Sequence, residues 1–202
     1  KGGIAMTMTA GSAVVSKDSP PSFDNIHAYK DEVVPWIKKL TDTIHDHDCK
    51  IMIQLTHLGR RTSWSKGDWL PSLSSGKHRE PAHKAFPKVI ESWDIERIIK
   101  EYGDAAERMK QGGMDGVELE GQGHLIGQFL SPLTNELNTE YGGSLENRLR
   151  FTIDVLSDIR KKVGQEFIVG IRCVFDEVEE GGINKSEGLK IAKILSDSGL
   201  VD

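Results

Sequence analysis

The chain has 202 residues, of which 37% are hydrophobic and 28% are charged, and its formal net charge is −5 at pH 7. This composition is typical of one ordinary globular domain. A net acidic chain with no basic stripe is not expected to bind nucleic acid. No run approaches the roughly 20 apolar residues that a bilayer-spanning helix needs, so no membrane partner is expected either.

The two cysteines, Cys49 and Cys173, lie far apart and have no CxxC spacing. This pattern predicts free thiols and a reducing compartment, and we therefore expect a cytoplasmic protein. The chain begins with KGG and has neither an initiating methionine nor the apolar core of a signal peptide. We expect that residues upstream of it are missing.

Hydrophobic periodicity predicts strands and helices in strict alternation. Short apolar runs predict strands at residues 4–9, 49–55, 116–119 and 167–173. Apolar positions at helical spacing predict helices at residues 31–48, 94–111, 145–162 and 186–198, and a further strand is expected to start at Val201. This order predicts an α/β fold with a parallel sheet and right-handed crossovers.

Polar residues follow each predicted strand, which favours a TIM (β/α)8 barrel, because such barrels build their active sites at the carboxyl ends of the strands. A doubly wound open sheet is the alternative, but it usually carries a GxGxxG turn that this chain lacks. A whole barrel takes about 250 residues and eight units. We therefore expect residues 1–202 to form one partial barrel domain, with unpaired sheet edges that make it unstable alone.

Residues 62–90 contain Pro71, Pro81 and Pro87 and show no clear period. A loop of this length without regular structure is usually a lid or a binding loop. Trp64 and Trp69 within it either line a substrate or pack the loop onto the body of the domain.

Local signals mark the ends of two helices. Ser92 or Asp94 is expected to cap the helix at 94–111, and Ser144 the helix at 145–162. Glu146 is placed to pair locally with Arg148 and Arg150 in that second helix.

Four tracts carry a resemblance to a known family. They are IQLTHLGRR at 53–61, QFLSPLTN at 128–135, EYGGSLENRLRF at 140–151 and VGIRCVFDE at 169–177. Together they resemble the old yellow enzyme family of FMN-dependent oxidoreductases, over nearly the whole chain. The likeness is strongest to the branch of 2,4-dienoyl-CoA reductases and of amine-oxidising or N-demethylating flavoenzymes.

The resemblance implies that the chain covers barrel strands two to five and the start of strand six, as part of an FMN-binding domain. It implies NADH or NADPH as the reductant, a small-molecule substrate and a homo-oligomer. In larger relatives, an iron–sulfur segment with a 4Fe–4S cluster and a second nucleotide domain follow the barrel.

Three residues match cofactor-binding positions of that family. Gly11 matches a small residue against the flavin's pyrimidine side, where only a small group permits close approach. Gln54 matches a glutamine that binds the same ring through its amide, and Arg172 matches an arginine near flavin N1 and O2. The structural alternatives are a buried, satisfied amide for Gln54 and an ion pair of Arg172 with Asp176 or Glu177.

His57 and Arg60 lie in the family's HxGR pattern. His57 is assigned a catalytic proton-transfer role, with a structural hydrogen-bonding role as the alternative. Arg60 and Arg61 could receive a substrate carboxylate or an acidic loop residue. We assign Arg60, Gln122 and Trp69 to substrate binding.

The cluster after the third predicted strand departs from the family pattern. Many relatives have a histidine directly after this strand and a tyrosine further on that protonates the substrate. Here Glu120 takes the first position, and His124 stands near the place of the tyrosine. Both are assigned catalytic roles, because a carboxylate can attract a cationic amine and an imidazole can act as acid or base. The structural alternative for Glu120 is an ion pair with a neighbouring arginine.

These observations predict an FMN-dependent oxidoreductase that reduces an enone, enoate or dienoyl substrate. The alternative is oxidative N-demethylation or dehydrogenation of an N-methyl amine, which Glu120 favours. Two hypotheses of other classes are a metal-dependent barrel hydrolase or lyase using His57, Glu120 and His124, and a non-catalytic barrel remnant. The sequence shows no recognised metal-binding spacing.

Overall fold

The computed structural model describes residues 2–9, 13–19, 25–61, 71–80 and 86–202. Gly11, Trp64 and Trp69, for which the sequence predicts binding roles, lie outside the described residues.

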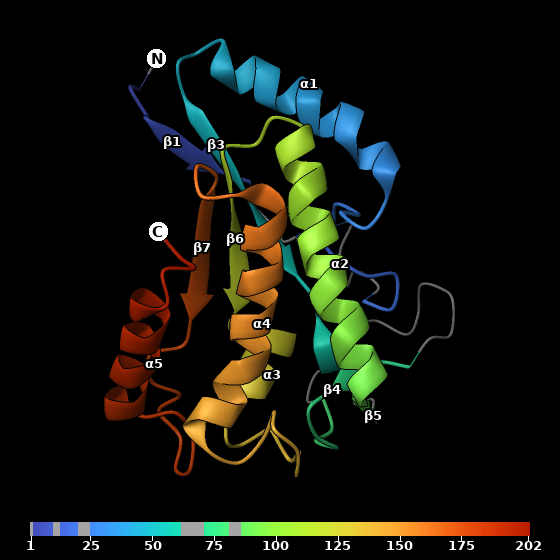
Figure 1. Cartoon of the computed structure of the whole chain (residues 1–202), viewed down its shortest axis with the longest axis vertical. Coiled ribbons are helices and arrows are strands. Elements are labelled where there is room, and N and C mark those ends of the chain that lie inside the picture. The colour runs from blue at the N-terminus through green and yellow to red at the C-terminus, as the bar shows by residue number, and fades with distance from the viewer. Residues whose placement is uncertain (1, 10–12, 20–24, 62–70, 81–85) are drawn as a thin grey trace.

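A parallel sheet forms the centre of the described structure (Figure 1). Its strands are β1 (Met6–Met8), β2 (Ala13–Val14), β3 (Lys50–Thr56), β6 (Gly116–Gly121) and β7 (Ile168–Cys173). The spatial order is β1-β3-β6-β7, and β2 also pairs with β3. Leu55 of β3 pairs with β2 on one side and with β6 on the other, so β1 and β2 lie on the same side of β3. The first strand predicted from the sequence therefore has a second part, at Ala13.

Four longer helices connect or follow the strands: α1 (Val34–His45), α2 (Ser92–Gln111), α4 (Leu145–Val163) and α5 (Lys185–Asp197). Every predicted helix is present, and so are the strands predicted at 4–9, 49–55, 116–119 and 167–173, with bounds within a few residues of the prediction. The 3₁₀ turn η1 (Asp31–Val33) forms the start of the helix predicted at 31–48. The sequence did not predict the short helix α3 (Leu125–Leu130), the 3₁₀ turn η2 (Gly59–Arg61) or the small sheet of β4 (Leu73–Ser74) and β5 (Lys88–Val89). The prediction of no regular structure at 62–90 is therefore wrong for part of that segment.

Helices α1, α2 and α4 cover one face of the sheet, and the strands all run toward the end of the molecule where α3, β4 and β5 lie (Figure 1). Alternation along the strands explains this arrangement. Val117, Leu119 and Val169 are fully buried beneath the helices, and burial of each side chain stabilises the fold by about 1.5–3 kcal/mol. The side chains between them, such as Glu118, belong to the opposite face, which we call the interior face.

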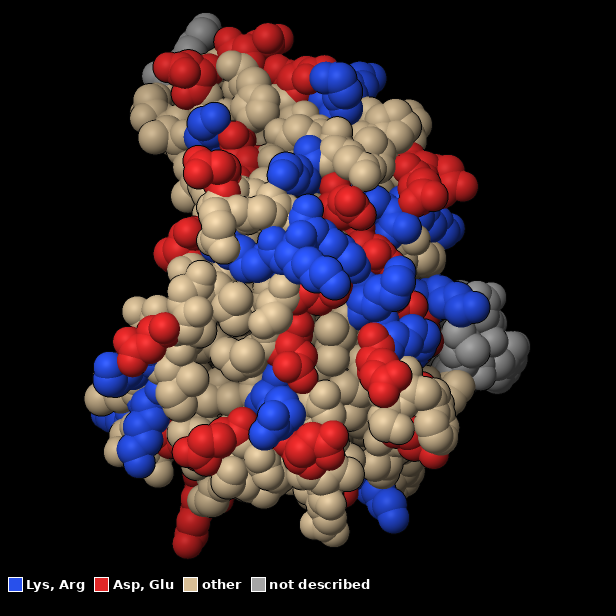
Figure 2. Space-filling model, viewed as in Figure 1, with Lys and Arg blue, Asp and Glu red and all other residues tan. Residues whose placement is uncertain are grey.

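Helices α2 and α4 approach closely because Gly103 has no side chain at their contact. A Cβ atom there would lie 2.0 Å from Asp158 Oδ2. Lys162 instead forms ion pairs with Asp104 at 2.8 Å and with Asp158 at 2.7 Å. Basic and acidic side chains interleave across this outer surface (Figure 2). Such surface pairs contribute less than about 1 kcal/mol each, so the apolar layer beneath holds the helices in place.

Helix-end predictions are confirmed in part. Ser144 caps α4 by accepting from the backbone N–H of Asn147, as predicted. At α2, however, the N-cap is Glu91, and Asp94 completes a capping box with it. The predicted local pairing of Glu146 with Arg148 and Arg150 is wrong, and Arg150 donates from Nε to the backbone oxygen of Glu140 at 2.9 Å. Arg148 reaches instead to Glu187 and to the backbone oxygens of residues 130 and 143, which ties α4 to α5 and to the loop before it.

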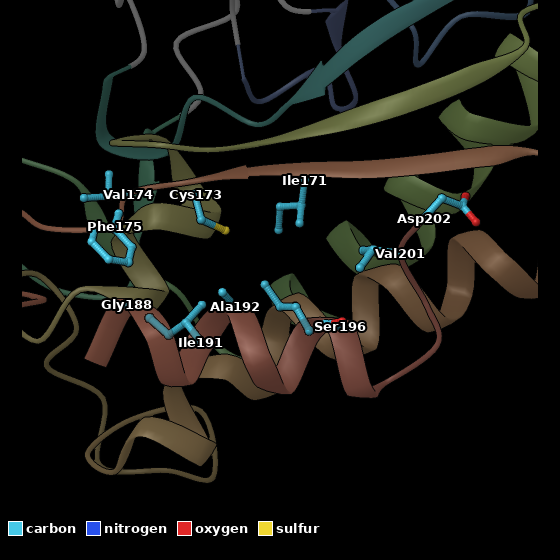
Figure 3. Close-up of a pocket in the computed structure, with 11 residues that line it drawn as sticks. Ile171, Cys173, Val174, Phe175, Gly188, Ile191, Ala192, Ser196, Val201 and Asp202 are labelled. Atoms are coloured by element: carbon cyan, nitrogen blue, oxygen red, sulfur yellow. The ribbon is translucent and has the colours of Figure 1, made fainter. Parts of the chain in front are cut away.

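The sheet is open at β7, which pairs with only one strand among the described residues. Asp202 bonds along this edge, since its N–H donates to Val169 O at 3.0 Å and its carboxylate accepts from Val169 N at 2.8 Å. These two bonds join Asp202 to β7, but residues 201–202 form no strand in the structure, so the strand start expected at Val201 stays a prediction. Between β7 and α5 lies a cavity of about 320 Å³, lined mainly by apolar side chains such as Ile171 and Ile191 (Figure 3).

Within the part of the chain that the structure describes, no helix is long and apolar enough to cross a membrane.

Gly188 tests the packing of α5. Glycine to alanine in an exposed helix stabilises it by about 1 kcal/mol. At Gly188, however, a Cβ atom would lie 2.1 Å from the backbone oxygen of Phe175. We expect Gly188→Ala to destabilise the protein by about 1–3 kcal/mol, measured as a fall in Tm by circular dichroism. Lys190→Ala, on the exposed side of the same helix, is the control and should change stability by less than about 0.5 kcal/mol. A higher Tm for Gly188→Ala would contradict this packing.

Candidate functional site

The interior face gathers polar side chains from three neighbouring strands. Gln54 of β3 pairs in register with Glu118 of β6, and Glu120 of β6 pairs in register with Arg172 of β7. Gln54, Glu120 and Arg172 lie in the second half of their strands, and Glu118 lies near the middle of β6, because parallel pairing aligns the carboxyl ends. The structure therefore brings together Gln54, Glu120 and Arg172, which the sequence assigned to cofactor binding or catalysis.

Glu118 joins two of these residues. The amide of Gln54 donates from Nε2 to Glu118 Oε2 at 2.6 Å. Arg172 donates from Nε to the same oxygen at 3.2 Å and from Nη2 to Glu118 Oε1 at 3.4 Å. The hydrogen bond and the charge of Glu118 raise the pKa of Arg172. The alternative of an Arg172 ion pair with Asp176 or Glu177 is therefore wrong about the partner, and Glu177 binds Ser131 Oγ instead.

Glu120 is half-buried beside this pair. Burial raises the pKa of Glu120, and the negative charge of Glu118 adds to the rise. The backbone N–H of Gln122, 2.8 Å from Glu120 Oε1, and the charge of Arg172 oppose it. Gln122 is exposed, so the structure places it at the rim of the interior face. Glu120 is thus a carboxylate that becomes neutral at a higher pH than an ordinary glutamate.

His124 lies at the N-terminal end of α3, and its Nδ1 is 2.8 Å from Thr56 Oγ1. Burial lowers the pKa of His124 to about 4, and the positive charge of Arg61 adds to the effect. The imidazole is therefore neutral at pH 7. In that state it is suited to a hydrogen-bonding role and not to act as a cationic acid, and its low pKa makes it a weak base.

His57 is placed differently from the other predicted catalytic residues. Its side chain is fully buried, and Nε2 lies 3.0 Å from Asp18 Oδ1. Nδ1 accepts from the backbone N–H of Gly59 at 3.1 Å, which leaves Nε2 as the protonated nitrogen that donates to Asp18. The backbone N–H of His57 donates to the hydroxyl of Tyr102 at 2.8 Å. Both ring nitrogens are therefore engaged in bonds that hold the strand end.

Asp18 anchors this buried network. It accepts from His57, from Ser16 Oγ at 2.5 Å and from Arg97 Nη2 at 2.5 Å. Burial alone would raise the pKa of Asp18, but the bonds from His57 and Ser16 and the charge of Arg97 hold it well below its usual range. The network ties the end of β3 to α2 and to the segment after β2.

Arg60 lines a small cavity of about 70 Å³ with Gln128, Ser131 and Glu177. Burial lowers the pKa of Arg60. Arg61 Nε lies 3.9 Å from Glu80 Oε1, so Arg61 does face an acidic loop residue, which was one of the two predicted roles for this pair.

Gln128 organises this end of the site. Its buried side chain accepts from Arg60 N at 3.1 Å and donates from Nε2 to Gly123 O at 3.1 Å. It therefore links the turn that carries Arg60 to the loop that carries His124. Gly59 makes room for it, because a Cβ atom at Gly59 would lie 2.3 Å from Gln128 Oε1.

Sequence reasoning missed Glu118, Asp18 and Gln128. A signal existed for Glu118, since a charged residue interrupts an otherwise apolar strand, and such a residue needs a partner. Asp18 contacts His57 and Arg97, which lie 39 and 79 positions away, and the partners of Gln128 lie up to 70 positions away. No local pattern indicates contacts at such separations.

The fold and the site together define part of a (β/α)8 barrel, with polar groups converging at the carboxyl ends of its strands. The sequence profile of the NADH:flavin oxidoreductase / NADH oxidase family matches residues 1–200. The chain belongs to this family.

Similarity to individual proteins agrees with the family. The chain is 66% identical, over its whole length, to a probable N-methylproline demethylase of Rhizobium meliloti, and it spans 30% of that protein. It is 45% identical to a multifunctional alkene reductase/demethylase of Caballeronia cordobensis, of which it spans 29%. Among solved structures, a 2-naphthoyl-CoA reductase complex matches 93% of the chain with a TM-score of 0.86 at 28% identity, and the match covers 30% of that protein. The predicted partial TIM barrel is confirmed.

Asp18 provides a test of the buried network. Because its folded-state pKa lies below the ordinary value of 3.8, the charged carboxylate stabilises the fold at neutral pH, and this contribution is lost as pH falls below about 4. We expect Asp18→Asn to lower the free energy of unfolding by about 3 kcal/mol at pH 7. The difference from wild type should shrink toward pH 3.

Urea unfolding at pH 7 and at pH 3 measures both effects. Asp31→Asn is the matched control, because Asp31 also pairs with an arginine, Arg108, but its side chain is 88% exposed. It should cost less than about 1 kcal/mol. Equal losses for the two variants would show that burial of the Asp18 network adds nothing.

Proposed function

We propose that the protein to which this chain belongs is an FMN-dependent oxidoreductase, and that the interior face holds the pyrimidine side of the flavin. The observation that carries the proposal is the convergence of Gln54 and Arg172, from separate strands, on one face of the sheet. An amide and a guanidinium fit the donor and acceptor atoms of that ring. Membership of a flavin oxidoreductase family supports the same assignment.

FMN, when bound, supplies the two-electron acceptor or donor for the reaction. Arg172 would place a fixed positive charge where reduction adds negative charge, and this favours the reduced state. Its side chain is 53% exposed on the interior face, so it is accessible to a ligand. Gln54 would bind the ring edge through its amide. Family membership favours NADH or NADPH as the reductant.

Oxidation of an N-methyl amine is the direction that Glu120 favours. A carboxylate on the interior face attracts a protonated amine and cannot polarise a carbonyl while it is ionised. The neutral imidazole of His124 can accept a hydrogen bond from such an amine, which must lose its proton to solvent before its N-methyl carbon gives up a hydride to the flavin. Water then adds to the iminium carbon, and cleavage of the C–N bond releases formaldehyde and the demethylated amine. Both curated relatives described above carry demethylase in their names.

Reduction of an activated alkene remains the second candidate, because one of those relatives is named as an alkene reductase as well as a demethylase. The family match favours both flavin hypotheses over the metal-dependent hydrolase and the non-catalytic remnant. Within this assignment, His57 holds the strand end and Arg60 contacts the substrate from its small cavity.

The compartment, the iron–sulfur cluster and the oligomeric state of the whole protein are also proposals. The two cysteines are free, which supports a reducing compartment such as the cytoplasm. The 4Fe–4S cluster of larger relatives stays a prediction, since residues 1–202 hold two cysteines and such a cluster needs four. Homo-oligomerisation also stays a prediction.

Arg172→Ala tests the flavin assignment. Loss of the cation should lower the midpoint potential of the bound flavin by about 60 mV, a hundredfold change in the two-electron equilibrium. An anaerobic titration against a redox dye, followed by the visible flavin bands, measures the shift. Arg172→Lys keeps the charge and should fall between wild type and alanine. An unchanged potential in Arg172→Ala would remove this residue from the flavin site.

Glu120→Gln tests the direction of catalysis. We expect KM for an N-methyl amino acid to rise about tenfold, because the attraction to the cation is lost, which corresponds to about 1.4 kcal/mol. Reduction of a neutral enone by the same variant should change less than about twofold. In wild type, KM for the amine should also rise as pH falls through the raised pKa of Glu120, and this acid limb should vanish in Glu120→Gln.

Anaerobic bleaching of the flavin by N-methyl amino acids, compared with reoxidation of the reduced flavin by enones, provides the readout. Bleaching by amines supports the oxidative direction. If amines cause no bleaching and enones reoxidise the flavin, the reductive candidate is favoured. A colourless protein that binds no FMN would overturn both.

A further inference from the structure

Glu118 occupies the centre of the interior face, between the two side chains proposed to contact the flavin. Gln54 is its register partner on β3. Arg172 of β7 has Glu120 of β6 as its register partner, but its side chain binds Glu118 instead. The side chain of Glu118 is only 14% exposed, whereas that of Arg172 is 53% exposed. The mostly buried carboxylate of Glu118 thus accepts hydrogen bonds from both side chains that are proposed to contact the flavin, Gln54 and Arg172.

The carboxylate determines how the Gln54 amide is turned. An ionised carboxylate can only accept hydrogen bonds, so the amide nitrogen faces Glu118 at 2.6 Å. A second hydrogen bond from Gln54 reaches Glu120. The oxygen and the nitrogen of an amide have nearly the same shape, so charge and not packing selects this orientation. The carboxylates therefore hold the amide nitrogen and fix which way the Gln54 amide is turned.

The same carboxylate tethers Arg172 and offsets its charge. The two contacts from Nε and Nη2, at 3.2 and 3.4 Å, hold the guanidinium against β6. A ligand on the interior face therefore meets the field of an ion pair and not of an isolated cation. Because charges interact strongly in a partly buried site, removal of the negative partner would strengthen the effect of Arg172.

We propose that Glu118 is a positioning residue for the flavin site, which orients the Gln54 amide, holds Arg172 in place and moderates the positive charge that Arg172 presents. The inference rests on the proposed function and adds to it a residue that acts through its two neighbours. A purely structural ion pair would hold the sheet together but would leave the redox properties of a bound flavin unchanged.

Glu118→Gln separates charge from shape. Glutamine keeps the length and one acceptor oxygen but removes the negative charge. In the FMN-loaded protein, we expect the ratio of reduced to oxidised flavin at a fixed potential to increase about tenfold, which is about 30 mV for a two-electron couple. This shift is opposite in sign to the one expected for Arg172→Ala. Glu180→Gln, an exposed carboxylate in the loop after β7, is the matched control and should not shift the potential.

A double-mutant cycle tests whether Glu118 acts through Gln54. FMN affinity of the apoprotein is measured by quenching of FMN fluorescence for Glu118→Ala, Gln54→Ala and the double variant. We expect each single variant to bind FMN about tenfold more weakly and the double variant to bind little more weakly than either, because both remove the same interaction. Glu118→Asp, which keeps the charge but shortens the reach, should weaken binding and leave the potential near that of wild type. It also provides a folded variant if Glu118→Ala does not fold.

Two results would overturn the inference: an unchanged or lowered potential in Glu118→Gln, or losses of FMN affinity that add fully in the cycle. Either result, together with the lowered potential in Arg172→Ala, would leave the proposed function intact. A wild-type protein that binds no FMN would overturn the proposed function and this inference together.

Discussion

The parallel pairing of β3, β6 and β7 is the constraint on which the rest of the structure depends. Parallel register aligns Gln54 with Glu118 and Glu120 with Arg172, and the two-residue alternation of a strand sends these side chains to the face opposite the helices. The same alternation buries the apolar residues between them, such as Val117 and Leu119, under α2 and α4. A shift of one residue in any pairing would exchange the core for the site, so the apolar layer that stabilises the fold also fixes the polar groups in place.

The strand ends need separate anchors, because a chain that leaves the sheet loses its ladder of hydrogen bonds. At the end of β3 the anchor is the buried pair of His57 and Asp18, which α2 supports through Arg97 and Tyr102. Beyond it, Gln128 connects the following turn to the loop after β6. These residues carry no obvious chemistry of their own. They hold the backbone from which the candidate catalytic groups project, as a preorganised site requires.

Electrostatics gives the interior face its particular character. Two carboxylates, Glu118 and Glu120, lie two residues apart, and one arginine cannot neutralise both. The pKa of Glu120 rises with burial, and that of His124 falls to about 4 for the same reason. A site with a spare carboxylate and a neutral imidazole is better matched to a cationic amine than to a carbonyl oxygen, which needs donors of positive charge. The electrostatic pattern therefore supports the proposal of a cationic amine as substrate.

The sequence by itself determined the alternation of strands and helices, the parallel sheet, the partial barrel and the family, because hydrophobic period and tracts such as EYGGSLENR are local properties. It also placed Gln54, Glu120, His124 and Arg172 near strand ends. Only the tertiary structure decided that Arg172 pairs with Glu118 and not with its sequence neighbours, and that His57 is buried against Asp18. These contacts join residues 39 and 54 positions apart, and their geometry depends on how the strands align and how the helices pack over them. No short-range pattern in the chain encodes that alignment.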